Sequence, residues 1–220
     1  MILAVAGGKG GVGKSTVALN LAAELDAVLV DADLTMADLP TGTGPDLHDV
    51  LAGRASPHAA VRTGGLVDIL PCGRTLAGAR IAEPTELPAV LEAVAASHGD
   101  VVVDTPAGME ADAGLPLATA EAAVLVTTGD RPAIADAVRT RELARELDAG
   151  LVRVVLNRVG PDPPTDRVRA ALGAPVVPVA RSQSVATAQA QGLPVRSLAP
   201  RSSAVEQFET LATAVYACKS

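Results

Sequence analysis

The chain has 220 residues, a formal net charge of −7 at pH 7 and a sequence pI near 4.9. Hydrophobic residues make up 49% of it, which argues against disorder, and aromatic residues only 1%, so we expect a core of Ala, Val and Leu. The acidic balance argues against strong binding to nucleic acid or to an anionic membrane face, because both require a basic surface.

Seven apolar runs along the chain predict strands. Several are continuous Val, Leu and Ile runs without polar alternation, which is typical of strands covered on both faces in a parallel sheet. In chain order they are Ile2–Val5, Ala27–Val30, Leu66–Leu70, Val101–Val103, Ala122–Thr127, Leu151–Leu156 and Pro175–Val179.

Helical patterns alternate with these strands. Two of the segments have a proline, Pro84 or Pro132, that suits a first-turn position. The alternation predicts an α/β fold with right-handed crossovers: a doubly wound, mostly parallel sheet of about seven strands with helices on both faces, forming one domain over residues 1–220. The helical segments are Lys14–Leu25, Asp46–Ala52, Pro84–Ala96, Pro132–Leu147, Asp166–Leu172 and one near Ser203–Ala217.

The first strand runs into a glycine loop that matches the P-loop pattern, Gly8-x4-Gly13-Lys14-Ser15, and a helix follows it. Glycines let successive N–H groups face one phosphate, and the helix N-terminus adds its positive dipole. We expect Lys14 to reach the β- and γ-phosphates and the Ser15 hydroxyl to bind Mg²⁺. The residues expected to bind the nucleotide here are Gly8, Lys9, Gly10, Gly11, Val12, Gly13, Lys14, Ser15 and Thr16.

The loop holds a second lysine, Lys9, although the whole chain contains only three. Its position at the start of the loop predicts that the side chain points outward, away from the nucleotide of its own subunit. Without further information a solvated surface lysine would be the ordinary interpretation.

GGKGGVGKST (7–16) resembles the deviant Walker A motif of the MinD/ParA family of ATPases, and other segments extend the resemblance to about residue 195. Within this family, the segments are most similar to the MinD-like proteins of archaea and bacteria. The segments are VDADLTMADL (30–39) for switch I, LHDVLAG (47–53) for the helix after it, VVVDTPAGMEADA (101–113) for Walker B and switch II, VVLNRV (154–159) for an adenine-reading strand end, and the late QGLPV (191–195).

The resemblance implies ATP and Mg²⁺ as cofactors and an ATP-dependent homodimer, in which Lys9 crosses to the partner's nucleotide. It also implies that Asp33 positions the attacking water with support from Asp31, which is a second candidate metal ligand. Asp104 would hold Mg²⁺ through water. Lys9, Lys14 and Asp33 are therefore the expected catalytic residues, since phosphoryl transfer needs placement and positive charge more than covalent chemistry.

The adenine side departs from the family pattern. Asn157 matches the family's adenine-reading Asn, but Ala180-Arg181-Ser182 stands where P-x-D is usual, so Arg181 is either an adenine-side contact or a surface arginine. In switch I, Asp38 stands where MinD-like proteins often have Asn.

The last helical segment carries Val205, Phe208, Leu211 and Val215 at helical spacing, with acidic residues on its polar side. A membrane-surface helix usually carries several basic residues, so we expect this helix to dock on the core and membrane binding to be weak.

The apolar run at the N-terminus is too short for a signal peptide, which predicts a cytoplasmic protein. Cys72 and Cys218 are too far apart in sequence to suggest a metal or redox pair.

These observations predict a slow, partner-stimulated ATPase that acts as a switch in intracellular positioning. A metallocentre assembly or insertion factor that uses the same ATP-driven dimer is an alternative. A non-hydrolysing, nucleotide-dependent scaffold is a third, and the presence of Asp33, Lys14 and Lys9 argues against it. The protein partner or activator is not identified by the sequence.

Overall fold

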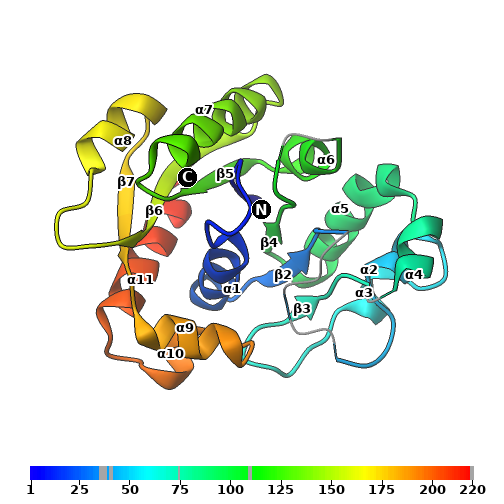
Figure 1. Cartoon of the computed structure of the whole chain (residues 1–220). Helices are drawn as coiled ribbons and strands as arrows, with labels where there is room; N and C mark the ends of the chain where they lie inside the picture. The colour runs from blue at the N-terminus through cyan, green and yellow to red at the C-terminus, as the bar shows by residue number, and fades with distance from the viewer. Residues whose placement is uncertain (35–38, 40–41, 74, 109–110, 219–220) are drawn as a thin grey trace.

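The computed structural model describes residues 1–34, 39, 42–73, 75–108 and 111–218, with backbone alone at 111–113. Its centre is a seven-stranded sheet in the order β3-β2-β4-β1-β5-β6-β7, in which every pair of neighbouring strands is parallel (Figure 1). The strands are β1 Ile2–Ala6, β2 Val28–Asp31, β3 Ile69–Leu70, β4 Val101–Asp104, β5 Ala122–Thr127, β6 Gly150–Val159 and β7 Val176–Ala180. The predicted doubly wound α/β fold is confirmed.

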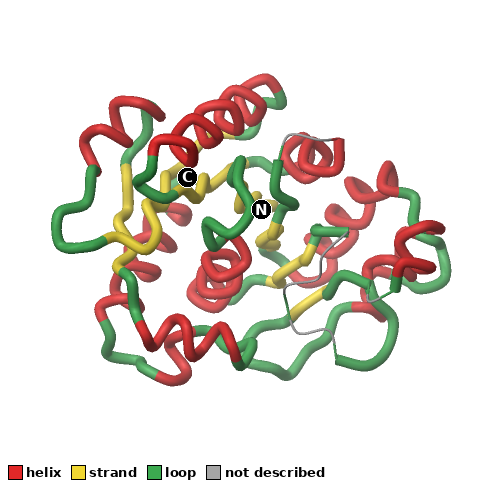
Figure 2. Tube along the Cα trace, viewed as in Figure 1, coloured by secondary structure: helices red, strands yellow, loops and turns green. Residues whose placement is uncertain are grey.

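Helices cover both faces of the sheet (Figure 2). One apolar cluster packs residues of α2, α3, α5, α7 and α8 against the sheet, and a second packs α1, α9, α10 and α11 against the opposite face. The helices are α1 Lys14–Leu25, α2 Leu47–Leu51, α3 Pro57–Ala60, α4 Leu76–Ile81, a 3₁₀ turn at Pro84–Glu86, α5 Leu87–His98, α6 Ala111–Thr119, α7 Arg131–Glu146, α8 Thr165–Leu172, α9 Gln183–Ala190, α10 Val195–Leu198 and α11 Ser203–Tyr216.

The core consists mainly of Ala, Val and Leu, as the composition predicted, and Phe208 is the largest side chain buried within it. Phe208 belongs to α11, which packs against α1, β6 and β7. Val205, Leu211 and Val215 of the same helix are also buried, so α11 docks its apolar face on the core as expected. No helix in the described part of the chain is both long and apolar enough to cross a membrane.

Several helices were not predicted from the sequence. In α6, Gly114 and Pro116 weaken the helical pattern, because both residues disfavour a helix interior. Helices α3, α4 and α10 are six residues long or shorter and begin after Ser56, Thr75 and Pro194, so tertiary packing rather than periodicity holds them.

The order of the strands decides where the site lies. From central β1, the chain crosses to β2 on one side, and later to β5 on the other, so the carboxyl end of β1 is the point at which the winding reverses. In open α/β sheets, ligands bind in the crevice at this point. The glycine loop follows β1 directly.

Candidate functional site

The glycine loop joins β1 to α1 at the centre of the carboxyl edge. Gly11 and Gly13 have φ angles of +76° and +99°, a conformation that other residues rarely adopt. A Cβ atom at Gly13 would lie 2.3 Å from Nδ2 of Asn157, and one at Gly8 would lie 2.5 Å from the carbonyl oxygen of Asp136 in α7. Gly8 and Gly13 therefore leave no room for a Cβ atom, and Gly13 also has the positive φ that glycine adopts readily.

Two polar residues at the start of α1, Lys14 and Thr16, are buried. Lys14 is 8% exposed although it is a lysine, and Thr16 is buried with a side-chain oxygen that has no hydrogen-bond partner among the described residues. A buried ammonium group beside the positive end of a helix requires a negative group nearby, and a nucleotide phosphate supplies one. This arrangement fits a phosphate at the helix N-terminus.

Two buried carboxylates stand beside the loop. Asp31 ends β2 and Asp104 ends β4, their Cα atoms are paired in register, and Asp104 is also paired with Val5 of β1. Both residues are at most 1% exposed. The structure thus brings Asp31, Asp104 and the P-loop together at adjacent strand ends.

Asp33 lies just beyond Asp31 and is partly exposed. Its backbone N–H donates to Oδ1 of Asp31 at 3.3 Å, so Asp31 supports the local backbone of Asp33. Asp38 of the same segment lies outside the described residues. The buried carboxylate of Asp31 therefore helps to hold the segment that carries Asp33, the residue expected to orient the attacking water.

Lys9 has an exposed side chain, and its Nζ lies 3.8 Å from Oδ1 of Asp130. Asp130 caps the N-terminus of α7 by accepting the N–H of Ala133 at 3.0 Å, and it also accepts the hydroxyl of Thr128. The Thr128 hydrogen bond, the Ala133 amide and the charge of Lys9 together lower the pKa of Asp130 below its ordinary value. Sequence reasoning missed Asp130 as the partner of Lys9, since nothing in the loop motif points to residue 130.

Asn157 and Arg158 close the loop from β6. Nδ2 of Asn157 donates to the carbonyl of Val12 at 2.8 Å, and a guanidinium nitrogen of Arg158 donates to the carbonyl of Gly11 at 2.8 Å. Arg158 has a φ angle of +57°, and the pairing of β6 with β7 shifts register at this point. Arg158 was missed because its role depends on a backbone conformation that its residue type does not announce.

A hollow of about 260 Å³ lies next to the loop, between the end of β6 and α9. Asn157 and Arg181 both line it, together with Thr16, Arg158, Ala180, Ser182, Val185, Ala186 and Gln189. The hollow has mixed polar and apolar walls, which suits a nucleoside base. Contact of Asn157 or Arg181 with adenine remains a prediction, and in this structure the Asn157 amide bonds the P-loop.

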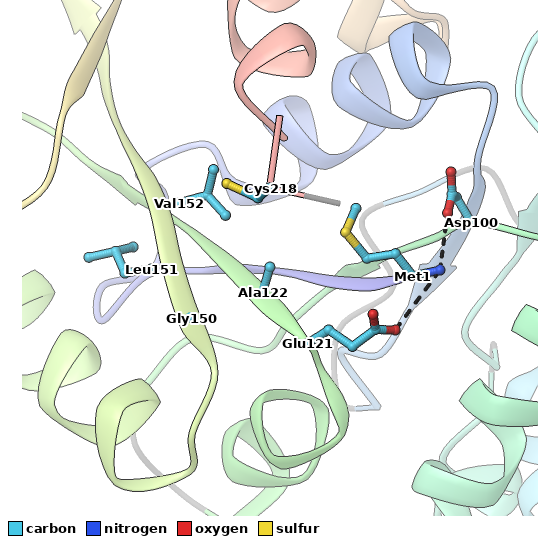
Figure 3. Close-up of a pocket in the computed structure, with 8 residues that line it drawn as sticks. All are labelled: Met1, Asp100, Glu121, Ala122, Gly150, Leu151, Val152 and Cys218. Carbon is cyan, nitrogen blue, oxygen red and sulfur yellow. Dashed lines mark hydrogen bonds and ion pairs between the residues drawn. The ribbon is translucent and has the colours of Figure 1, made fainter. Parts of the chain in front are cut away.

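Two larger hollows lie at the opposite edge of the sheet. One, of about 580 Å³, is lined by Met1, Asp100, Glu121, Ala122, Gly150, Leu151, Val152 and Cys218 (Figure 3). The other, of about 460 Å³, lies between the ends of α7 and α8. Neither contains any residue predicted for the site.

The described residues contain no group of three His, Cys, Asp or Glu side chains arranged to hold a metal. Mg²⁺ in nucleotide sites usually takes one or two protein ligands plus waters and phosphate oxygens, so it does not need such a group. The Ser15 hydroxyl at the start of α1 and the buried Asp104 carboxylate are oxygen donors of the right kind.

Residues 3–195 match the CobQ/CobB/MinD/ParA nucleotide-binding domain family. The chain belongs to this family. An uncharacterized ATP-binding protein of Methanocaldococcus jannaschii is 37% identical over an alignment of 175 residues that covers 74% of this chain and 66% of that relative. The chain thus spans slightly less than two thirds of this relative.

Two solved structures are similar over nearly their whole length. The cell division ATPase MinD of Pyrococcus furiosus is 28% identical with a TM-score of 0.92, covering 98% of each chain. The septum site-determining protein MinD of Pyrococcus horikoshii, solved in complex with Mg-ADP, is 28% identical with a TM-score of 0.90, covering 97% of this chain and 94% of that one. The resemblance to MinD-like proteins seen in the sequence is confirmed.

Proposed function

We propose that this chain is a Mg²⁺-dependent ATPase that dimerises when it binds ATP and acts as a switch in intracellular positioning. The observation that carries the proposal is the grouping at one sheet edge of a glycine loop, a buried lysine and strand-end aspartates. The Pyrococcus relatives described as a cell division ATPase and as a Mg-ADP complex support it.

The residues proposed to hold Mg²⁺ are Ser15, directly, and Asp104, through water. Bound there, Mg²⁺ supplies positive charge to the phosphate oxygens. Asp31 accepts the Asp33 amide with Oδ1, which favours a supporting role for Asp31 over direct metal binding. Lys14, at the N-terminus of α1, is proposed to bind the β- and γ-phosphates.

Hydrolysis then depends on Asp33 and Lys9. Asp33 orients the attacking water, and positioning of this kind is most of what phosphoryl transfer requires from a protein. Lys9 is exposed at the surface of the loop, where it can leave Asp130 for a nucleotide held by a second copy of the chain. Its contribution to catalysis is therefore proposed to require the dimer.

Two variants separate these roles. Asp33→Ala removes a carboxylate outside the phosphate loop, so it should bind ATP and accumulate as an ATP-bound dimer that hydrolyses poorly. Lys9→Ala should bind ATP, remain monomeric and hydrolyse poorly, because the missing charge belongs to the other subunit's site. Light scattering with ATP and Mg²⁺, combined with phosphate release, distinguishes the two. Dimerisation of Lys9→Ala at the wild-type ATP concentration would contradict the proposed role of Lys9.

The cellular part of the proposal requires a separate test. A fluorescent fusion of the wild-type chain should form localised or patterned foci, and Lys14→Ala should lose them, because it cannot enter the ATP state. Capture with the Asp33→Ala dimer should then retain the protein partner. A uniform signal together with loss of a metalloenzyme activity in a deletion strain would instead support the assembly factor.

A further inference from the structure

Every backbone N–H and carbonyl group from Ala32 to Leu34 has a hydrogen-bond partner. The N–H of Ala32 donates to the carbonyl of Asp104 at 3.0 Å, and the N–H of Leu34 donates to the carbonyl of Ala32 at 3.0 Å. The latter bond closes a γ-turn that has Asp33 at its centre. With the bond from Asp33 N–H to Asp31, the three N–H groups and the first carbonyl of this segment are satisfied.

The remaining two carbonyls are bound by side chains from elsewhere in the chain. The thiol of Cys72 donates to the carbonyl of Asp33 with Sγ at 3.1 Å. Nε2 of His48 lies 3.1 Å from the carbonyl of Leu34. A carbonyl oxygen can only accept, so Nε2 of His48 carries a proton and is the donor, in either charge state of the ring.

His48 and Cys72 form one unit although they are distant in sequence. His48 lies on α2 and Cys72 follows β3, and the N–H of Leu47 donates to the carbonyl of Pro71 at 2.9 Å. Sγ of Cys72 is 3.7 Å from Nε2 of His48, and both residues are at most 3% exposed. Burial, and to a smaller degree the negative charge of Asp31, raises the pKa of Cys72 to about 12, so its thiol keeps its proton at neutral pH.

Two glycines fit closely around the His48 ring. A Cβ atom at Gly73 would lie 1.8 Å from Nδ1 of His48, and one at Gly78, in α4, would lie 3.1 Å from it. Nδ1 is buried and has no hydrogen-bond partner among the described residues. A buried polar atom without a hydrogen bond costs free energy. The ring therefore lies where its Nε2 binds the carbonyl of Leu34, at the cost of leaving Nδ1 unsatisfied.

We propose that His48 and Cys72 are positioning residues for hydrolysis: they hold the carbonyls of Leu34 and Asp33 and so fix the direction of the Asp33 carboxylate. The inference rests on the proposed role of Asp33. Neither side chain lies in the phosphate loop or on the hollow beside it. Loss of either donor should therefore lower the rate of hydrolysis and leave ATP binding intact.

Matched variants test this inference. Cys72→Ala removes the donor and Cys72→Ser keeps a donor of similar size; His48→Leu removes the donor and His48→Gln keeps an N–H near the position of Nε2. We expect roughly a threefold lower kcat for Cys72→Ala and a tenfold or greater loss for His48→Leu, since small misplacements of reacting groups cost up to about 100-fold. Cys72→Ser and His48→Gln should recover most of the loss, and ATP affinity by calorimetry should stay within about twofold in all four.

Each variant is assayed below its own melting temperature, alongside Asp33→Ala. If Asp33→Ala hydrolyses ATP as the wild type does, the proposed role of Asp33 fails, and the positioning role with it. If Asp33→Ala is impaired while Cys72→Ala and His48→Leu keep the wild-type kcat, the positioning inference alone is wrong. Equal losses of kcat in the donor-removing and donor-keeping variants would also overturn it, because they would indicate packing rather than hydrogen bonding. If His48→Leu fails to fold, the cysteine pair decides the matter.

Discussion

The two edges of the sheet differ in a way that hollow size does not reveal. The carboxyl edge has the smaller hollow, about 260 Å³, but it gathers buried polar groups such as Lys14, Asp31 and Asp104. The amino edge has hollows of about 580 and 460 Å³, and the carboxylates at the larger one are more exposed (Figure 3). Burial of a polar group costs free energy unless it is compensated, so polar burial marks a site better than volume does.

The largest effect is expected at the carboxyl edge, from Lys14→Ala. The ammonium group is proposed to make charge-assisted hydrogen bonds to two phosphates, each worth about 1.5–3 kcal/mol. Two such bonds correspond to at least about a 100-fold loss of ATP affinity, since about 1.4 kcal/mol is tenfold. Calorimetry with ATP and Mg²⁺ measures it. Unchanged affinity would show that the buried lysine is structural and would remove the main contrast between the edges.

The next effect concerns stability within the glycine loop. At Gly8 an added methyl group would meet the backbone of α7, whereas at Gly10 nothing lies within 4 Å of the added atom. Gly8→Ala should therefore lower the stability by about 1–3 kcal/mol, the usual cost of overpacking, and Gly10→Ala by less than about 0.5 kcal/mol. Thermal unfolding of the pair measures the difference. Equal melting temperatures would mean that the loop and α7 are not packed as described.

Much of the carboxyl edge could be predicted from the sequence because the signals are local. The glycine loop, Lys14 and Ser15 form a contiguous motif between a strand and a helix, and Asp31 and Asp104 directly follow predicted strands. Strand-end carboxylates of neighbouring parallel strands necessarily meet at one edge. The alternation of strands and longer helices followed from the same local patterns, although several of the helices did not.

The rest depends on contacts between residues far apart in sequence. Asp130 meets Lys9, Arg158 meets Gly11, and His48 meets Leu34 only after the chain has folded. His48 is buried, and the carbonyl that it binds could not be read from any motif. The strand predicted over Leu66–Leu70 is longer than β3. Its bounds depend on pairing with β2, which is distant in sequence, and only Ile69 and Leu70 make that pairing.

A smaller, pH-dependent effect is expected from Asp130→Asn. Asn retains the cap of α7 but removes the charge that faces Lys9 and the helix N-terminus, which is worth about 0.3–1 kcal/mol at an exposed position. The pKa of Asp130 is lowered in the folded state, so its carboxylate stabilises the fold above the unfolded value near 3.9, and this contribution is lost as pH falls through the lower folded pKa. The melting temperature of the wild type should exceed that of Asp130→Asn at pH 7, and the gap should close below about pH 4. A gap of constant size from pH 7 to pH 3 would exclude a charge effect.

The smallest effect is expected at the amino edge, from Asp100→Asn. The ammonium group of Met1 lies 3.1 Å from Asp100 and 3.9 Å from Glu121, whose side chain is 66% exposed (Figure 3). Ion pairs that water reaches contribute about 1 kcal/mol or less, and salt screens them. For a chain of this size the melting temperature should therefore fall by about 2–4 °C at most, and less at high ionic strength.

ATP affinity and hydrolysis of Asp100→Asn should match those of the wild type, since the substitution lies at the ends of the strands that are far from the glycine loop. As a control, mass spectrometry should first check that Met1 is retained in both proteins, because the ion pair requires its free ammonium group. A loss of ATP affinity comparable to that of Lys14→Ala would mean that the large hollow serves the nucleotide site, and the distinction between the two edges would be wrong.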